Sequence, residues 1–594
     1  MAVDLLNDWK RTHDCGSLRG EDVGREVVLM GWVNRRRDLG KVTFIDLRDR
    51  TGLTQIVLDR EFDEISHKKA GILRNEWVIA VKGTVSPRLA GQENPELPTG
   101  AIEVKIRELK ILNETAVPPF QVDGKIDASE SLRLKYRYLE LRRPTLFHNM
   151  AMRHKIALQI RNTLSREGFV EVETPFLTKS TPEGARDYLV PSRISKGRFY
   201  ALPQSPQLFK QLLMVAGFDR YFQIVRCFRD EDLRADRQPE FTQVDMEMSF
   251  TKEDGVMDVV ETLMVDLFST TLGYTLSRPF PRLEYQRAMD LYGSDKPDIR
   301  YGMELTDISD SLRSCGFKVF TDVLDAGGIV KAINVKGGAS SSRKDLDGLN
   351  DMVVASGARG LFWAKIKSDG WQSSLAKFLV ANTRRAVEEK LGAAEGDLLI
   401  IVSDKPQVTN EALGSLRVEI GKRLNLAKPG TYSFVWITRF PLLEYSSEEE
   451  RFVAVHHPFT APLEEDLAFL AKEPQRVRAR SYDVVLNGQE IGGGSVRIHT
   501  LDLQNRIFRA LGLGKEEIRE KFGFFLEALT YGTPPHAGIA LGFDRLVAIM
   551  VGAESLRDVI AFPKTQRATC AVTDAPSEVN KNQLAELGLT LKDG

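Results

Sequence analysis

The sequence predicts a multidomain α+β protein, and three features of the chain lead to this prediction. At 594 residues the chain is too long for one hydrophobic core, so several domains are expected. Its first 112 residues contain five short strand patterns separated by turns, which favour a small closed β-barrel. Residues 289–425 change character and alternate apolar runs with glycine-rich turns, which indicates an inserted α+β domain.

The domain boundaries follow from connectors and helical patterns. A proline-containing connector, NETAVPPFQVDGK, and a helical stretch form a hinge over residues 113–145. A first core segment is expected over 146–288, the insertion over 289–425, a second core segment over 426–565 and a peripheral tail over 566–594. In the first core segment a helix should end at Gly168 and a strand at Pro175. The loop that follows contains Glu183 and is a candidate lid, with a plain connector as the alternative.

Charge and cysteine content limit the possible partners and compartments. The 82 basic and 83 acidic residues nearly cancel, so a nucleic-acid partner would need a local basic patch. The four cysteines are far apart and form no CxxC, which fits a reducing cytoplasm. The first residues are charged too early for a secretory signal, and the apolar stretch GIALGFDRLVAIMVGA is interrupted by charge, so no membrane association is expected.

The segment Phe228–Met248 is the most informative part of the chain and predicts an antiparallel hairpin. At the two-residue period of a strand, Arg229 and Glu231 share one face. Phe241, Gln243 and Asp245 likewise share one face. Such a set of unlike polar groups is unusual for a purely structural face, because each unpaired polar group costs free energy. The alternative is a solvated hairpin face with an incidental charge pattern.

Arginines are the predicted phosphate ligands. Neither a Walker A sequence nor a GxGxxG motif follows a strand, and the guanidinium fork can pair with phosphate oxygens. Arg229 should end a strand, while Arg545 should lie at a strand-to-helix junction. Asp483 and Glu490, seven residues apart around a strand and turn, are candidate Mg²⁺ ligands. A plain surface strand is the alternative for the two acids.

The barrel carries a pattern suited to single-stranded nucleic acid. A basic run ending at Arg37 lies close to Phe44, and Gln55 is on another strand. Phosphates need cations and bases need a ring on which to stack. A charged edge strand that resists aggregation is the alternative.

These residues together resemble the bacterial-type aspartyl-tRNA synthetases, which are class II enzymes, over nearly the whole chain. The three class motifs correspond to the helix and strand ending at Pro175, the FRDE…QPEFTQ hairpin and the sequence Gly542-Phe543-Asp544-Arg545. TPEGARDYLVPSR, QSPQLFKQLLM, HHPFT and GGGSVRIH separate aspartate enzymes from their lysine and asparagine relatives. The resemblance implies an OB-fold barrel, a class II antiparallel-sheet core and a GAD-type insertion.

For the amino acid, the resemblance implies that Lys210 and Arg497 hold the side-chain carboxylate of L-aspartate. Other implied aspartate-binding residues are Glu183, Ser205, Gln207, Arg229, Asp245, His456 and His457. A zinc site at the two histidines is the competing interpretation, but no third ligand lies at a suitable spacing.

For ATP, the resemblance implies adenine stacking on Phe241, the α-phosphate on Arg229 and the γ-phosphate on Arg545. The remaining implied ATP-binding residues are Asp230, Glu231, Gln238, Glu490, Gly542, Phe543 and Asp544, with Mg²⁺ on Asp483 and Glu490. The class II resemblance also implies a homodimer.

The implied tRNA partner is tRNA(Asp), whose anticodon would be read by Arg37, Phe44, Gln55 and Glu103. Some relatives also charge tRNA(Asn). Here Leu39 is similar to the strict enzymes, whereas the loop at Gly91 is similar to the relaxed ones, and dual specificity is slightly favoured. The alternatives are an inactive synthetase-like nucleic-acid-binding protein and an amidating paralogue. The complete barrel disfavours the paralogue.

Overall fold

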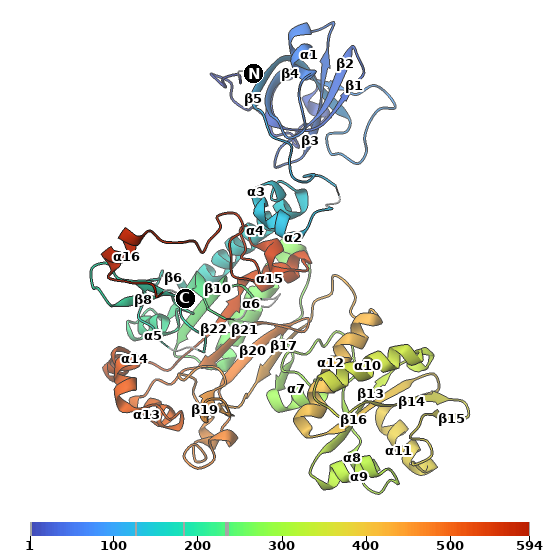
Figure 1. Ribbon diagram of the computed structural model, residues 1–594, viewed down its shortest axis with the longest axis vertical. Helices are drawn as coiled ribbons and strands as arrows, with labels where there is room; N and C mark the ends of the chain where they lie inside the picture. The colour runs from blue at the N-terminus through green and yellow to red at the C-terminus, as the bar shows by residue number, and fades with distance from the viewer. Residues whose placement is uncertain (1–2, 125–126, 182–183, 232–236, 593–594) are drawn as a thin grey trace. The chain divides into compact units, whose positions relative to one another are not determined.

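The computed structural model describes residues 3–124, 127–181, 184–231 and 237–592. The chain forms two compact units, one of residues 1–152 with 557–578 and the other of residues 153–556 with 579–594. Figure 1 shows the elements along the chain. Among the described residues, no helix has the length and apolar character needed to cross a bilayer.

The N-terminal strands close into a five-stranded barrel in the order β1-β2-β3-β5-β4. Their bounds are Glu26–Asp38, Val42–Arg48, Leu53–Asp59, Val78–Pro87 and Ile102–Asn113 for β1 to β5. Inward side chains such as Leu29, Ile45 and Ile56 are fully buried and alternate with more exposed ones, which is the pattern of a packed barrel. The helix α1, Glu64–Ala70, begins after Asp63, whose side chain accepts the backbone N–H groups of Ile65 and Ser66.

The hinge contains two short helices, α2 (Glu130–Lys135) and α3 (Arg137–Glu140). Tyr136 leaves helical geometry between them, so the predicted single helical stretch is divided. Arg137 is buried and pairs with Glu140 at 2.7 Å. The longer helix α4, Pro144–Arg166, follows.

An eight-stranded sheet forms the centre of the second unit, in the order β11-β17-β20-β21-β22-β10-β9-β6. Its interior pairs are antiparallel and its two outermost pairs are parallel. The strands are β6 (Val170–Glu171), β9 (Arg220–Phe228), β10 (Glu240–Ser249), β11 (Arg282–Glu284), β17 (Phe434–Thr438), β20 (Ser481–Leu486), β21 (Gln489–Val496) and β22 (His536–Gly542).

Two predicted strand ends differ from the structure. The strand expected to reach Pro175 ends at Glu171, because the chain leaves β9 after Val172 donates its N–H to the carbonyl of Phe222. Arg229, which was expected to end a strand, lies one residue beyond β9. The predicted strand-to-helix junction at Arg545 is present, with β22 ending at Gly542 and α15 beginning at Phe543.

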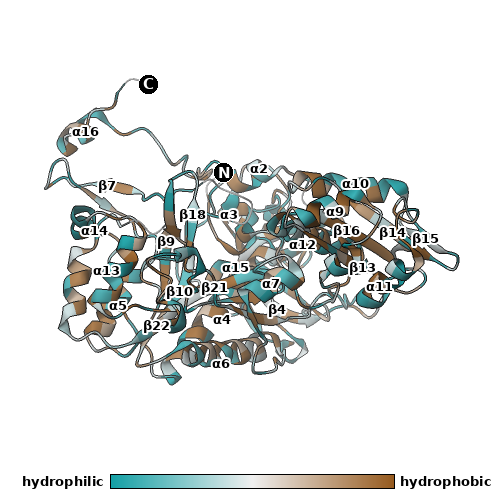
Figure 2. Cartoon of the chain, turned by 90° about the horizontal axis from the view of Figure 1, so that it is seen from below, coloured by the Kyte–Doolittle hydropathy of each residue, from teal (hydrophilic) through white to brown (hydrophobic). Residues whose placement is uncertain are grey.

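Helices and two small hairpins accompany this sheet. The helices are α5 (Gln207–Val215), α6 (Glu253–Leu272), α13 (Leu501–Ala510), α14 (Lys515–Ala528) and α15 (Phe543–Val551). The hairpins are β7–β8 (Leu189–Pro191 and Phe199–Ala201) and β18–β19 (Leu443–Ser446 and Arg451–Ala454). The alternating hydrophobic and hydrophilic segments of α6 are visible in Figure 2, and its apolar residues are buried.

The inserted segment has its own five-stranded sheet in the order β12-β13-β16-β14-β15. Apolar clusters cover both faces of this sheet, so β13 and β16 are buried almost throughout. Its elements are α7 (Tyr285–Tyr292), β12 (Thr306–Asp307), α8 (Ser309–Leu312), α9 (Lys318–Asp325), β13 (Ile329–Val335), α10 (Arg343–Ala355), β14 (Phe362–Lys367), β15 (Gly370–Gln372), α11 (Ala381–Leu391), β16 (Leu398–Asp404) and α12 (Pro406–Arg423). Near the C-terminus the chain forms α16, Lys581–Leu587.

Candidate active site

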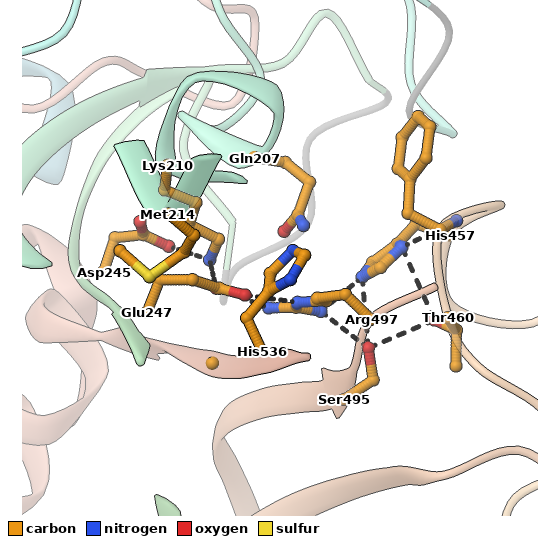
Figure 3. Close-up of polar contacts among 12 residues, drawn as sticks. Gln207, Lys210, Met214, Asp245, Glu247, His457, Thr460, Ser495, Arg497 and His536 are labelled. Carbon is orange, nitrogen blue, oxygen red and sulfur yellow. Dashed lines mark hydrogen bonds and ion pairs between the residues drawn. The ribbon is translucent and has the colours of Figure 1, made fainter. Parts of the chain in front are cut away.

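A buried network of four charged side chains lies beside the central strands (Figure 3). Lys210 on α5 lies with its Nζ 2.5 Å from Oδ1 of Asp245 and 3.4 Å from Oε2 of Glu247, both on β10. Arg497, directly after β21, donates to both carboxylate oxygens of Glu247 at 2.9 and 3.1 Å. The structure therefore brings the two predicted carboxylate-binding cations together.

All four groups are nearly inaccessible to water, so their charges must balance within the protein. Burial raises the pKa of Asp245 to about 6, although the Lys210 ammonium opposes this shift. Burial also acts against the ionised form of Glu247, but Arg497 and Lys210 outweigh it and its pKa is lowered. Two cations and two carboxylates thus make a compact and nearly neutral cluster.

Three polar atoms in this pocket (Figure 3) have no protein partner within the described part of the chain. They are Oδ2 of Asp245, Nε2 of Gln207 and Nε2 of His536, all buried. Ser205 lies beside them, with its Oγ accepting the backbone N–H of Gln207 at 3.3 Å. Unpaired buried polar atoms are costly unless a ligand meets them, so they suit a polar ligand. Glu183, the predicted lid residue, lies outside the described residues.

His457 and Ser495 contact Nη1 of Arg497, the guanidinium nitrogen that does not bind Glu247. Arg497 Nη1 donates to Oγ of Ser495 at 2.6 Å and lies 2.7 Å from Nε2 of His457. Since a guanidinium only donates, this His457 nitrogen accepts. Burial and the Arg497 charge lower the pKa of His457 well below its usual value, so the ring is neutral.

A cavity of about 290 Å³ adjoins the charged network along the same strand face. Phe241 and Gln243 of β10 line the cavity, and Asp245 and Glu247 follow on that face at the strand period. The Arg229 guanidinium lies 5.2 Å from the centre of the Phe241 ring, and its Nε has no hydrogen-bond partner among the described residues. An aromatic face beside a guanidinium is suited to a nucleotide.

The other hairpin residues divide into cavity walls and supports. Glu231 and Gln238 line the cavity, and Glu231 pairs with Arg237 at 2.6 Å. The backbone N–H of Asp230 donates to the Arg186 carbonyl at 3.0 Å, which fixes the chain just beyond β9.

The sequence Gly542 to Arg545 forms the neighbouring part of the cavity wall, because Gly542 on β22 pairs with Gln243 on β10. Arg545 donates to the backbone carbonyl of Glu490, and Gly542 lines the cavity. Asp544 accepts the N–H of Thr242 at 2.8 Å and pairs with Arg153 at 2.6 Å. Phe543 is buried. The contacts of Asp544 and the burial of Phe543 fit support of the wall better than direct nucleotide contact.

Asp483 and Glu490 converge above Gly493 on the paired strands β20 and β21. A Cβ on Gly493 would lie 2.7 Å from Oδ1 of Asp483 and 4.0 Å from Oε1 of Glu490, so glycine keeps this space open. Burial and the Asp483 charge raise the pKa of Glu490. Crowded carboxylates of this kind fit a divalent cation with oxygen ligands.

His456 approaches the carboxylate pair, with Nε2 3.3 Å from Oδ1 of Asp483. Burial acts to lower the pKa of His456, but the Asp483 charge outweighs it and the pKa is raised. Among the described residues, no group of three or more His, Cys, Asp or Glu side chains could hold a metal ion. The zinc interpretation of the two histidines therefore gains no support.

On the barrel, the four predicted anticodon residues form one connected group, in which Gln55 and Glu103 are buried. Arg37 donates to the Oε1 of Gln55 at 3.0 Å, and Gln55 donates to Glu103 at 3.1 Å. The Arg37 guanidinium lies 5.9 Å from the centre of the Phe44 ring. Leu39, in the turn between β1 and β2, and Gly91, in the loop between β4 and β5, are exposed.

Sequence reasoning missed Glu247, Ser495 and His536 in the buried pocket. Glu247 lies two residues after Asp245 and Ser495 two before Arg497, so the strand period places each pair on one face and could have identified both. His536 begins β22, and no sequence signal connects it with a pocket built from distant segments.

The fold and site together define a multidomain protein. It combines a closed β-barrel, whose basic and aromatic residues suit nucleic acid, with an antiparallel sheet that carries an arginine-lined cavity. Residues 129–566 match the family model described as tRNA synthetases class II (D, K and N), and residues 27–112 match the OB-fold nucleic acid binding domain. The chain therefore belongs to the class II tRNA synthetases of the D, K and N group. The predicted fold class is confirmed.

Close relatives align over almost the whole chain. It is 55% identical over 588 residues to the aspartate--tRNA(Asp/Asn) ligase of Syntrophotalea carbinolica and 54% identical over 587 residues to that of Geotalea uraniireducens, with 99% of each chain covered. Asparaginyl-tRNA synthetase from Pyrococcus horikoshii complexed with asparaginyl-adenylate has a similar fold, with a TM-score of 0.59, 19% identity and coverage of 94% of this chain and 98% of that chain.

Proposed function

We propose that this enzyme ligates L-aspartate to tRNA(Asp) through an aspartyl-adenylate and also aspartylates tRNA(Asn). The observation that carries the proposal is the buried pair Lys210 and Arg497, which adjoins the arginine-lined cavity along one face of β10. The names of the relatives at 54–55% identity support the amino acid and the tRNA range.

Selection of aspartate rests on charge. The β-carboxylate would accept hydrogen bonds from Lys210 and Arg497, and the unpartnered Oδ2 of Asp245 would accept from the α-ammonium. Ser205, Gln207 and the lid residue Glu183 would complete the ammonium site. Asparagine would turn an amide NH₂ toward a desolvated guanidinium, and a site of this kind rejects such an analogue by about 10⁴-fold or more.

In the first step, an oxygen of the aspartate α-carboxylate attacks the α-phosphorus of ATP. The bond from that phosphorus to the bridging oxygen breaks, and its electron pair leaves with pyrophosphate. The carboxylate is already ionised at neutral pH, so no general base is needed. Arg229 would hold the α-phosphate, Arg545 the γ-phosphate and Phe241 the adenine ring, so catalysis comes from positioning and charge stabilisation.

Asp483 and Glu490 would hold Mg²⁺, since their carboxylates are crowded and the pKa of Glu490 is raised. The ion would supply positive charge against the phosphate oxygens. His456, which lies beside Asp483, would orient this carboxylate and line the aspartate pocket. Asp230, Glu231, Gln238, Gly542, Phe543 and Asp544 would shape the nucleotide site around them.

In the second step, the terminal 3′-hydroxyl oxygen of tRNA attacks the aspartyl carbonyl carbon. The bond from that carbon to the phosphate oxygen breaks, AMP leaves with the electron pair, and the hydroxyl proton passes to the departing phosphate or to water. Phe44 would stack on an anticodon base, while Arg37, Gln55 and Glu103 would read base edges or phosphates. Leu39 and Gly91 are the positions proposed to set the tRNA range.

The domain roles and assembly are also proposals. Residues 1–112 bind the anticodon, 113–145 form the hinge, 146–288 and 426–565 form the catalytic core, 289–425 form the GAD-type insertion, and 566–594 form the tail. Leu158 on α4 and Val170 on β6 are 50% and 48% exposed, and such apolar exposure supports a homodimer through the first class motif. The four cysteines, far apart along the chain and without a CxxC, support a cytoplasmic location.

Aspartate-dependent ATP–pyrophosphate exchange and charging of purified tRNA test the proposal. We expect exchange with aspartate but not asparagine, and aspartylation of both tRNA(Asp) and tRNA(Asn). Absence of exchange in the folded protein would instead favour the inactive nucleic-acid-binding alternative. If tRNA(Asp) is charged but tRNA(Asn) is charged only at background, the proposed dual tRNA specificity is wrong and the rest of the proposal stands.

A further inference from the structure

Two further cavities adjoin the nucleotide cavity in series, and residues of the inserted segment line the last of them. The nucleotide cavity and a second cavity of about 360 Å³ share Arg545 and Leu556 in their walls. The second cavity and a third of about 300 Å³ share Arg300 and Asn487. Shared wall residues make the three spaces neighbours in series.

The loop that forms one wall of the third cavity is held firmly from the side of the inserted domain. Nη2 of Arg417 on α12 donates to the backbone carbonyls of Asp298, Tyr301 and Gly302 at 2.8, 2.8 and 2.9 Å. Its guanidinium also lies 4.8 and 4.4 Å from the ring centres of Tyr292 and Tyr301. This buried arginine therefore fixes residues 298–302.

The turn between β20 and β21 holds the same loop from the catalytic side. Gly488 adopts a left-handed backbone with φ of +80°, and a Cβ there would lie 3.1 Å from the Cβ of Asp298. Only a very small residue allows this close approach. Because the turn leads directly to Glu490, the loop is positioned next to the proposed metal and phosphate site.

Positive charge exceeds negative charge along the third cavity. Its charged lining residues are Lys296, Arg300 and Lys422 against Asp298, and Asp298 is already paired with Arg300 at 2.6 Å. In the second cavity, Arg300 and Arg545 face the single acid Glu554.

Lys296 is exposed, and no ion pair to its ammonium is found among the described residues. Lys296 lines the third cavity, which adjoins the second through Arg300, and the second adjoins the nucleotide cavity through Arg545, the proposed γ-phosphate ligand.

We propose that these cavities form the exit route for inorganic pyrophosphate, with Lys296 and Arg300 receiving the anion beyond Arg545. The inference rests on the proposed adenylate-forming function. A multiply charged product leaves a ring of arginines faster when the next cation lies close along the path. The charged residues described in the walls of the second and third cavities are mostly basic, which suits a small anion such as pyrophosphate.

The test compares Lys296→Ala with Lys344→Ala, an exposed lysine on α10 of the same inserted domain, in aspartate-dependent exchange. For Lys296→Ala we expect the KM for pyrophosphate to rise about 10- to 150-fold, the range for one charge-assisted contact, with the KM for ATP changed less than about twofold. Lys296→Arg should keep most of the wild-type affinity, and Lys344→Ala should match wild type.

Each outcome separates the two proposals. Wild-type protein without exchange overturns the proposed function itself. Normal wild-type exchange together with an unchanged pyrophosphate KM in Lys296→Ala overturns the exit route alone. Equal increases in the KM for pyrophosphate and the KM for ATP would mean that Lys296 acts in the ATP site. That result would also overturn the exit route.

Discussion

Replacement of Arg497 by methionine tests the proposed basis of aspartate selection. The guanidinium is 1% exposed and makes two hydrogen bonds to Glu247, at 2.9 and 3.1 Å, and one to Ser495 at 2.6 Å. Methionine has a similar length but no charge. It would leave Glu247 with Lys210 at 3.4 Å as its remaining ion-pair partner in the described pocket.

Two effects of different size are expected. Breaking a buried ion pair lowers the free energy of unfolding by about 3–5 kcal/mol, because one carboxylate remains buried with less compensation. Loss of the contact to the substrate carboxylate costs about 2–5 kcal/mol in binding. At 1.4 kcal/mol per tenfold change, kcat/KM for aspartate should fall about 30- to 4000-fold.

The assay is ATP–pyrophosphate exchange at varied aspartate and at varied ATP, after circular dichroism and gel filtration show a folded protein. Arg480→Met is the matched control, because Arg480 makes a similar double hydrogen bond to Glu253, at 2.7 and 2.7 Å, on another part of the same unit. The control should keep its KM for aspartate. An unchanged aspartate KM in folded Arg497→Met would refute the reasoning.

Three further predictions follow from the site. Arg229→Ala should abolish exchange because it removes the α-phosphate ligand, and near-normal exchange by a folded variant would contradict this role. Phe44→Ala should raise the KM for tRNA and spare adenylate formation, whereas equal loss of both would contradict a stacking role in the barrel. The pKa of Asp245 is raised to about 6, and the ionised carboxylate is the form that accepts the ammonium of the substrate. We therefore expect kcat/KM for aspartate to fall as the pH drops below about 6. A flat profile of kcat/KM from about pH 5 to 8 would contradict this role of Asp245.

Local patterns were sufficient to predict the hairpin and the strand-to-helix junction at Arg545. Alternation along β10 placed Phe241, Gln243 and Asp245 on one face, and the structure has them there, next to Glu247. Periodicity is a local property of the backbone, so it can be read without knowledge of distant contacts.

Strand ends were predicted less well than strand positions. Proline at 175 indicated where a strand must stop at the latest, but β6 ends at Glu171 because its pairing with β9 ends earlier. The partner strand decides how long an edge strand can be, and sequence alone does not contain the register.

The sequence alone determined the periodicity of the strands and helices, the types of charged side chain and the family motifs. Only the tertiary structure decided that Glu247 joins Lys210 to Arg497, which is 250 residues away from Glu247 along the chain. It also decided that Lys296 of the inserted segment lines a cavity in series with the nucleotide cavity. The reason is that a buried charge is tolerated only where partners from other strands and helices meet it, and that meeting depends on packing and sheet order.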